Sequence, residues 1–294
     1  MTATIVAQQA INGIVLGSLY VLVALGLTLI SGVLVQINFA HADFVTLGAF
    51  SAYFFMHVLG GSYLASIGVA LFVGAALGWL INVAIFAPLR RKGNELLPLI
   101  ATIGVSVMLQ NAMLSLFGPV PYAFETPYSR QVFRVAGTFF TMQSIIIIAV
   151  STATIGLLYA FMKFTFLGKA LRAVSQDRET AGLMGINPNQ LIMLTFVIAS
   201  ALAGMAGAML APVLVLTPFA GTSVIVKAFA IVIIGGFGNV EGTILAGLIV
   251  GLIESYTTQY LDPGLIDIVV FALLLLMLAI RPTGLISERR EENV

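Results

Sequence analysis

The sequence predicts an all-α protein, a polytopic bundle of transmembrane helices, and three observations support this prediction. The chain has 294 residues, of which 60% are hydrophobic and only 9% are charged, whereas soluble domains carry about 25% charged residues. Its apolar runs are long and continuous, as expected for helices that each need about 20 apolar residues to cross a bilayer. A transmembrane β-barrel would instead give short segments of alternating polarity.

Glycine, proline and polar residues divide the chain into nine apolar segments, and we expect each segment to form one membrane-spanning helix. An arrangement of eight spans, with residues 219–236 as a re-entrant segment, is the main alternative. In both arrangements residues 1–294 form a single transmembrane domain. The nine segments cover residues 8–34, 40–59, 63–87, 96–117, 138–162, 190–214, 219–236, 242–260 and 264–281.

The basic residues are concentrated in three patches, and their placement predicts the orientation of the chain. Cytoplasmic loops of membrane proteins carry an excess of lysine and arginine. With nine spans all three patches fall in the cytoplasm, which puts the C-terminus inside and the N-terminus outside; eight spans would move the third patch outside. The N-terminus lacks the positive region of a signal peptide, so we expect no cleavage. The patches are Arg90, Arg91 and Lys92; Lys163, Lys169, Arg172 and Arg178; and Arg281, Arg289 and Arg290.

Small residues recur at every fourth position in three segments, a pattern that lets helix backbones approach closely in lipid. Packing within one chain explains the pattern, and a face for a second transmembrane subunit is the alternative. The stripes are Ala199, Ala203, Gly207 and Ala211; Thr243, Gly247, Gly251 and Ser255; and Ala70, Gly74 and Gly78.

The sequence offers no set of residues for enzyme chemistry, so we expect that the chain is not an enzyme. It contains no cysteine and only two histidines, His41 and His57, without the spacing of a metal site. The glycines at 236, 238 and 242 lie between apolar segments rather than in the βαβ unit of a dinucleotide site. There is no P-loop motif, so ATP hydrolysis that drives this chain must take place in another subunit. We expect no cofactor, metal or nucleic acid to bind this chain.

Two interruptions of the apolar pattern are candidates for a translocation pathway, because polar breaks in membrane helices persist where they line a cavity or lie buried in protein. One covers residues 36–43, and the other follows the segment 219–236. Two tight cytoplasmic turns are an equally good explanation. A carboxylate at position 254, within the eighth segment, either packs between helices or lines the same conduit. The candidate pathway residues are Asn38, His41, Asp43, Lys227, Gly235, Gly236 and Glu254.

The loop at about residues 163–189 mixes charged and apolar residues, as docking surfaces do. Asp177 can cap a short helix, Glu179 favours the positive end of that helix, and Gly185 can end it in the left-handed conformation. This short helix either contacts a cytoplasmic partner or rests on lipid headgroups.

Glu179-Thr180-Ala181, followed by Gly185, resembles the EAA-type coupling motif of ABC importer permeases. Residues 168–173 and 185–187 are similar to the version of this motif in the branched-chain amino-acid ABC transporter permease family. Further similarity to that family, including residues 37–44 and 235–238, runs from about residue 8 to residue 285. Thr180 replaces the central alanine of the motif, and Ala42 stands where the family is expected to have glycine.

This resemblance implies the ABC importer permease fold and a subunit of the bacterial inner membrane that imports leucine, isoleucine and valine, with urea or short-chain amides as the alternative substrates. The implied partners, besides membrane lipid, are a second permease subunit that is a paralogue, two cytoplasmic ATPase subunits that use the ATP, and a periplasmic substrate-binding protein. The segment 118–137 is either a docking site for that binding protein or a stiff connector. The implied coupling residues are Arg172, Asp177, Arg178, Glu179, Thr180, Ala181 and Gly185.

An autonomous secondary transporter is the main alternative from another functional class. Such a carrier needs a coupling-ion site, usually built from several intramembrane carboxylates. The sequence offers only Glu254 and Asp43 in apolar surroundings, so we expect transport to depend on partner subunits.

Overall fold

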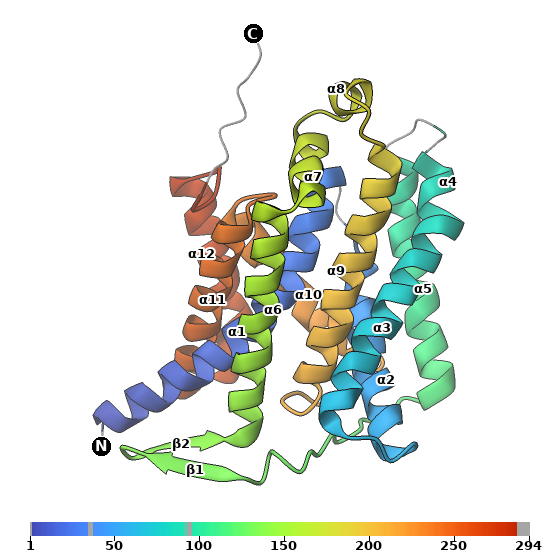
Figure 1. The fold of residues 1–294 in the computed structure, drawn as a ribbon. Helices are drawn as coiled ribbons and strands as arrows, with labels where there is room; N and C mark the ends of the chain where they lie inside the picture. Colours follow the sequence, from blue (N-terminus) through green and yellow to red (C-terminus); the bar gives the residue numbers. More distant parts are fainter. Residues whose placement is uncertain (1, 35–37, 91, 93–95, 287–294) are drawn as a thin grey trace.

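The structure is a computed structural model that describes residues 2–34, 38–90, 92 and 96–286. Long helices form one bundle, with a two-stranded hairpin at one end, the hairpin end, and the helices α7 and α8 at the other, the α8 end (Figure 1). The predicted polytopic all-α fold is confirmed. The long helices are α1 (Thr2–Leu34), α2 (His41–His57), α3 (Tyr63–Ile81), α5 (Leu96–Phe117), α6 (Met142–Phe164), α9 (Pro188–Leu210), α10 (Ala220–Gly235), α11 (Val240–Tyr260) and α12 (Ile266–Ile280).

Short elements extend or join these helices. The helix α3 continues through a π-helical turn, in which the N–H of Ala87 donates to the carbonyl of Asn82, five residues back. Pro88 follows immediately and has no N–H with which to continue the α-helical pattern. The short elements are η1 (Asn82–Phe86), α4 (Ala87–Arg90), β1 (Val132–Val135), β2 (Thr138–Thr141), α7 (Phe166–Gln176), α8 (Arg178–Leu183) and η2 (Pro263–Leu265).

Each of the nine predicted segments overlaps one of the long helices, although α1, α6, α9 and α11 extend beyond the predicted bounds. In the described part of the chain, seven helical stretches are long and apolar enough to cross a membrane. The helices α2 and α10 have only 17 and 16 residues, whereas α12 reaches 18 residues together with the preceding turn η2. The number of membrane crossings and the orientation of the chain therefore stay predictions. Arg91, Arg289 and Arg290 of the basic patches lie outside the described residues.

The predicted segment 138–162 begins too early. Residues Thr138–Thr141 form strand β2, which pairs antiparallel with β1. The turn between the strands consists of Ala136 and Gly137, whose φ angles are 51° and 85°, and two positive φ angles are typical of tight hairpins. Only after this strand does α6 begin, where the hydroxyl of Thr141 accepts the backbone N–H of Ser144.

The helix α1 lies at the centre of the bundle and packs against α9, α10 and α11. In its most apolar window 89% of the residues are buried, compared with 11% in α12. The helices α5, α6 and α12, with 28%, 17% and 11% of their most apolar windows buried, present apolar surface that lipid or another membrane subunit would cover.

The stripes of small residues lie at helix contacts within the chain. A Cβ atom added to Gly74 of α3 would lie 2.3 Å from the carbonyl oxygen of Ser200 on α9, and one added to Gly207 of α9 would lie 1.9 Å from that of Val45 on α2. Gly251 of α11 meets the backbone of α1 in the same way. Packing within one chain is thus confirmed at these glycines.

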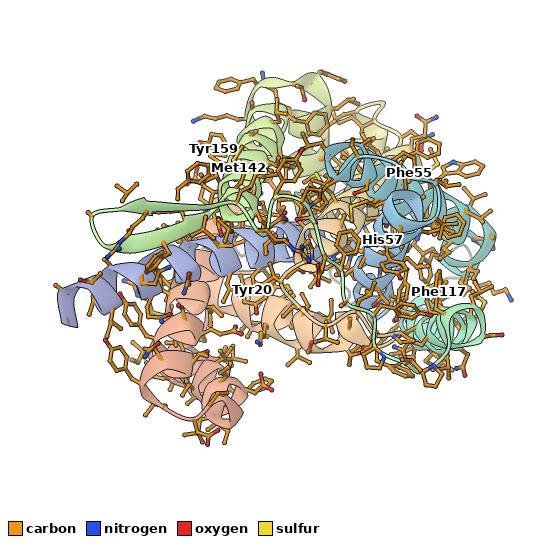
Figure 2. All side chains as sticks on the ribbon, turned by 90° about the horizontal axis from the view of Figure 1, so that it is seen from below. Tyr20, Phe55, His57, Phe117, Met142 and Tyr159 are labelled. Carbon is orange, nitrogen blue, oxygen red and sulfur yellow. The ribbon has the colours of Figure 1, made fainter. Side chains whose placement is uncertain are left out.

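Aromatic rings gather at the hairpin end, on α2, α5 and the connector that follows α5. Tyr53 stacks on His57 with 4.5 Å between ring centroids, and Phe50 lies 4.3 Å from Phe117. Figure 2 views the bundle from this end, with His57 and Phe117 labelled. Such belts are typical of the membrane–water interface.

Candidate functional site

The predicted loop at residues 163–189 contains two helices rather than one. Between α6 and α7 the hydroxyl of Thr165 accepts the N–H of Gly168 and so begins α7. Leu171 on the apolar side of α7 is buried, and Arg172 donates a hydrogen bond to the carbonyl of Met162 near the end of α6. These contacts pack α7 against the bundle, so this part of the predicted loop is a docked helix.

Asp177 caps α8 as the sequence predicts. Its carboxylate accepts the backbone N–H groups of Glu179 and Thr180 at 2.9 and 3.1 Å, and the hydroxyl of Thr180 at 2.5 Å. The bond from the Thr180 hydroxyl holds the pKa of Asp177 below its usual value. Gly185 follows the helix with a φ of 84°, so the predicted left-handed end is also confirmed.

The helix α8 presents an apolar surface and is tied to α1 by one side chain. Leu183 and Met184 are 88% and 80% exposed, whereas Ala181 is buried. Arg178 donates a hydrogen bond of 2.6 Å to the carbonyl of Val33 in the last turn of α1. The last carbonyls of a helix have no partner within it, and a positive charge is favourable there. This contact therefore joins α8 to the last described turn of α1.

Asn38, His41 and Asp43 lie inside the bundle, where α2 begins. His41 is fully buried, and its Nε2 lies 3.1 Å from the carbonyl oxygen of Val23 on α1. Val23 lies eleven residues before the end of α1, so this contact lies about 16 Å from that end at 1.5 Å per residue. The Asn38 amide nitrogen, Nδ1 of His41 and one oxygen of Asp43 have no hydrogen-bond partner among the described residues.

The helix α10 begins in the interior as well, against the start of α2. The N–H of Gly221 donates to the hydroxyl of Thr46 at 2.9 Å, and a Cβ atom at Gly221 would lie 1.9 Å from the carbonyl oxygen of Ala42. The N-terminal ends of two short helices thus meet within the bundle. The sequence analysis placed the second interruption after the segment 219–236. In the structure, the break that faces the start of α2 lies before this segment, at residues 211–219.

Gly235 and Gly236 lie in a turn between α10 and α11. Gly236 has a φ of 105°, and Asn239 caps α11. The N–H of Leu285 donates to the carbonyl of Ile234 at 2.8 Å, which gives the end of α10 a backbone partner. Gly235 and Gly236 thus lie in a turn between two helices, and a role of this turn in the translocation pathway stays a prediction.

Lys227 of α10 and Glu254 of α11 form an ion pair with 2.6 Å between Nζ and Oε1. Their side chains are only 13% and 9% exposed. Tyr20 of α1, in the middle of the bundle (Figure 2), donates to the same oxygen of Glu254 at 3.1 Å. The sequence singled out the two charged residues separately, and the structure brings them together. Because charges within a membrane are tolerated when they are paired, the pair joins three helices as a neutral unit.

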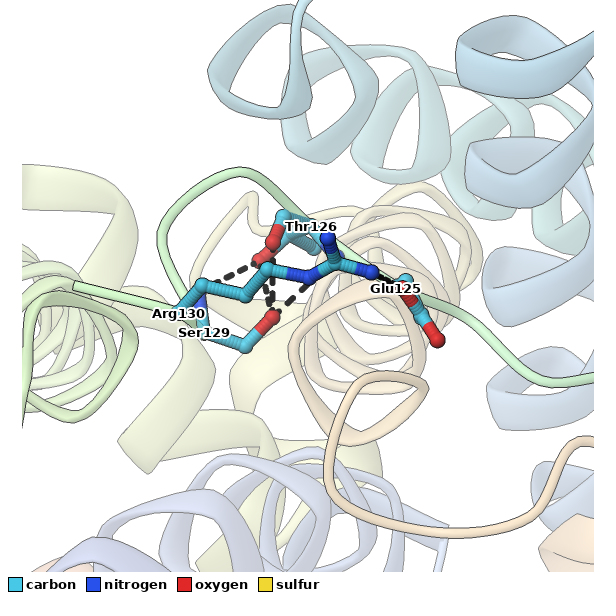
Figure 3. Close-up of polar contacts among 4 residues, drawn as sticks. All are labelled: Glu125, Thr126, Ser129 and Arg130. Carbon is cyan, nitrogen blue, oxygen red and sulfur yellow. Dashed lines mark hydrogen bonds and ion pairs between the residues drawn. The ribbon is translucent and has the colours of Figure 1, made fainter.

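The connector at the hairpin end is held to the bundle through Thr126. Its hydroxyl donates to Gln143 at 2.9 Å, and the amide of Gln143 donates to the hydroxyl of Tyr63 at 2.6 Å. Arg130 and Glu125 also pair at 2.6 Å (Figure 3), but their side chains are 81% and 69% exposed. Exposed pairs of this kind contribute little to stability. Docking of a partner at this connector stays a prediction.

Sequence reasoning missed several partners of the candidate residues. Asp43 interacts with Ser106 and Gln110 of α5, and two polar residues four apart in an apolar segment were the available signal. Arg90, predicted only as a determinant of topology, donates to the amide oxygen of Asn82 at 2.9 Å. Within the described part of the chain, no group of three or more potential metal ligands occurs.

Comparison with known proteins gives consistent results along the chain. A family model described as branched-chain amino acid transport system / permease component matches residues 9–278. The chain is 34% identical over 301 residues to the high-affinity branched-chain amino acid transport system permease protein LivH of Escherichia coli K12, covering 98% of this chain and 97% of that protein. It is 33% identical over 300 residues to the permease protein BraD of Pseudomonas aeruginosa, with the same coverage. It is also similar to LivM of Escherichia coli K12, at 23% identity over 98% of this chain and 72% of LivM.

Proposed function

The chain belongs to the family of branched-chain amino acid transport system permease components. From this premise we propose that it imports leucine, isoleucine and valine as the membrane subunit of an ATP-driven transporter in the bacterial inner membrane. The observation that carries the proposal is the identity of 33–34% to LivH and BraD along nearly the whole chain. The similarity to LivM as well as LivH supports a paralogous second permease subunit as partner. ATPase subunits and a periplasmic binding protein complete the proposed assembly.

The helices α7 and α8 are the proposed contact for the ATPase subunits. The exposed Leu183 and Met184 offer an apolar surface, and the cap at Asp177 and the turn at Gly185 fix the ends of the helix that carries it. The bond from Arg178 to Val33 supports a direct route from this contact to α1. A motion of α8 would thereby act directly on the last turn of α1, and coupling between two sites requires such a physical connection.

The interior start of α2 is the proposed translocation pathway. Asn38, His41 and Asp43 are polar, buried and incompletely hydrogen bonded, and polar groups at such a helix break are typical of transporter pathways. Lys227 and Glu254 are paired with each other, so their proposed contribution is to hold α10 beside this pathway. No step of the proposed mechanism requires chemistry on the solute.

The proposed function is tested by uptake of radiolabelled leucine into cells that express the chain with its neighbouring transport subunits. We expect Glu179→Lys and Gly185→Asp to insert normally and to abolish ATP-dependent uptake, because they change the proposed ATPase contact. Glu241→Gln removes an exposed carboxylate at the start of α11, outside α7 and α8, and keeps an acceptor for the Tyr159 hydroxyl, so it should leave uptake unchanged. Normal uptake by both loop variants at equal expression would contradict the coupling role.

Competition separates the substrate classes. Unlabelled isoleucine and valine should suppress leucine uptake, whereas urea and acetamide should not. Suppression by urea or acetamide alone would overturn the assignment to branched-chain amino acids. Leucine transport by the purified chain alone in liposomes, without nucleotide, would instead indicate an autonomous transporter.

A further inference from the structure

The last turn of α1 meets the turn between α10 and α11 at a contact between two glycines. A Cβ atom added to Gly32 of α1 would lie 3.1 Å from Cα of Gly238 in this turn, and one added to Gly238 would lie 3.2 Å from Cα of Gly32. Gly238 has a φ of 80°, which glycine adopts far more readily than other residues. One turn earlier on α1, the buried hydroxyls of Thr28 and Thr243 are 2.8 Å apart. The α10–α11 turn therefore lies directly against the end of α1.

This glycine contact lies next to the carbonyl to which α8 is bound. Arg178 of α8 donates to the carbonyl of Val33, and Val33 directly follows Gly32 in the same turn of α1. A displacement that α8 imposes on Val33 therefore also acts on Gly32. Because closely packed parts of a protein transmit strain rather than compress, the α10–α11 turn has to follow when the end of α1 is displaced toward it.

The C-terminal segment 281–286 holds the α10–α11 turn as well. A Cβ atom added to Gly236 would lie 2.7 Å from the carbonyl oxygen of Ile286, so these two backbones are in close contact. The N–H of Leu285 donates to the carbonyl of Ile234 in the last turn of α10 at 2.8 Å. The end of α10 and the turn that follows it are thus packed as one unit. A force on this turn is therefore transferred to α10 and is not lost in a loose connection.

The helix α10 connects this turn with the proposed pathway. It has 16 residues and is therefore about 24 Å long. Its start lies in the interior of the bundle, where the N–H of Gly221 donates to the hydroxyl of Thr46 on α2 at 2.9 Å. Lys227 lies seven positions after the start of α10 and eight before its end, and the ion pair with Glu254 holds α10 at this middle position. A rigid helix held at its middle tilts, so a displacement of one end also moves the other.

We propose that Gly32 and Gly238 are positioning residues for transport, through which a motion of α8 reaches α10 and, at the other end of α10, the start of α2. The proposal rests on the proposed function, since it names the route from the ATPase contact to the translocation pathway. Neither glycine has a side chain to offer the solute, so their role is to keep the end of α1 and the α10–α11 turn in contact. A long side chain at position 32 would hold the turn away from α1 and interrupt the route.

The test measures distances between spin labels on the complete transporter in lipid nanodiscs. The chain contains no cysteine, so cysteines introduced in pairs can be labelled when the partner subunits are made cysteine-free. A reference label at Leu64, exposed at the start of α3, is paired either with Gln176, exposed at the end of α7, or with Phe237, exposed in the α10–α11 turn. On addition of a non-hydrolysable ATP analogue we expect both distances to change. A change at position 176 without a change at position 237 would overturn the proposal.

The variant Gly32→Leu then interrupts the contact. We expect leucine uptake to fall about fivefold or more, the lower end of the usual coupling between two sites, while the assembled transporter still hydrolyses ATP and the distance to position 237 no longer responds. Gly156→Leu makes the same substitution on α6, at a glycine with open space around it, and is the matched control, with no expected change. Unchanged uptake by Gly32→Leu, or an equal loss of uptake and ATP hydrolysis in a stably folded variant, would overturn the proposal. If Gly32→Leu does not fold, the label distances on the chain with glycine at position 32 still decide.

Uptake measured on the same preparation separates this inference from the proposed function. ATP-driven leucine uptake with a movement at position 176 and none at position 237 would overturn the inference and leave the proposed function standing. Movement at both positions, without uptake of any branched-chain amino acid by the complete system, would support the inference and overturn the proposed function.

Discussion

Removal of one charge from the pair of Lys227 and Glu254 should destabilise the bundle far more than removal of both. Lys227→Met leaves the carboxylate of Glu254, 9% exposed, with Tyr20 as its remaining partner. An uncompensated buried charge costs about 3–5 kcal/mol, a large share of the about 5–15 kcal/mol that stabilises a folded protein. The double variant Lys227→Met with Glu254→Gln removes both charges, keeps an acceptor for Tyr20, and should be close to neutral.

The assay is a double-mutant cycle on the purified chain, with the free energy of unfolding measured by denaturant titration in detergent micelles. Because the double variant should be close to neutral, the coupling energy equals the summed cost of the two single variants, and we expect it to be at least about 3 kcal/mol. The pair of Arg130 and Glu125 is a matched control, because it has the same distance of 2.6 Å but is 81% and 69% exposed; Arg130→Met and Glu125→Gln should show no measurable coupling. A stable double variant should also retain leucine uptake. Stable protein without uptake would refute the reasoning that the pair only holds helices together.

Two further predictions concern the helix contacts and the cap of α8. Gly207→Ala should destabilise the bundle by about 1–3 kcal/mol, because its Cβ would lie 1.9 Å from the carbonyl oxygen of Val45. Gly156→Ala, at a position with open space around it, should stabilise α6 slightly. Thermal unfolding of both variants measures these effects. The pKa of Asp177 is lowered in the folded chain, so its stabilising effect is present above the ordinary value of 3.8 and lost as the pH falls through the lowered pKa. A spin label at position 184 should therefore become mobile on acidification in the parent chain, while Asp177→Ser, a cap that does not titrate, should give a label whose mobility is independent of pH.

Features that depend on a few neighbouring residues could be predicted from the sequence. The cap at Asp177 and the left-handed turn at Gly185 each involve groups within a few residues, so residue type and spacing determine them. The stripes around Gly74 and Gly207 were predictable for a similar reason, because side-chain size alone decides how closely two membrane helices approach. The hairpin was missed because the run at 138–141 is as apolar as the helix that follows, and the positive φ angles at Ala136 and Gly137 leave only a weak sequence signal.

Contacts between distant residues could not be predicted in the same way. Lys227 and Glu254 lie 27 positions apart on different helices, and whether they meet depends on how α10 and α11 are rotated about their axes. The bond from Arg178 to Val33 spans 145 positions and involves a backbone carbonyl, which no side-chain pattern reveals. The interior start of α10 was not predicted, because the polar turn at Gly235 and Gly236 gives a clearer break in the hydropathy than residues 211–219 do.

Three contacts with other helices lie at different heights along α1. Its Tyr20 binds the ion pair of α10 and α11, its Val23 carbonyl contacts His41 at the start of α2, and its Val33 carbonyl accepts Arg178 of α8. The contact at Val33 uses one of the last carbonyls of the helix, so it can form and break without cost to the bonds inside α1. The contact at Tyr20 belongs to a buried charge pair, whose disruption would be expensive. In the proposed mechanism a displacement of α8 is therefore absorbed at the Val33 end of α1, while the part of α1 that carries Tyr20 and the Val23 contact to His41 stays fixed.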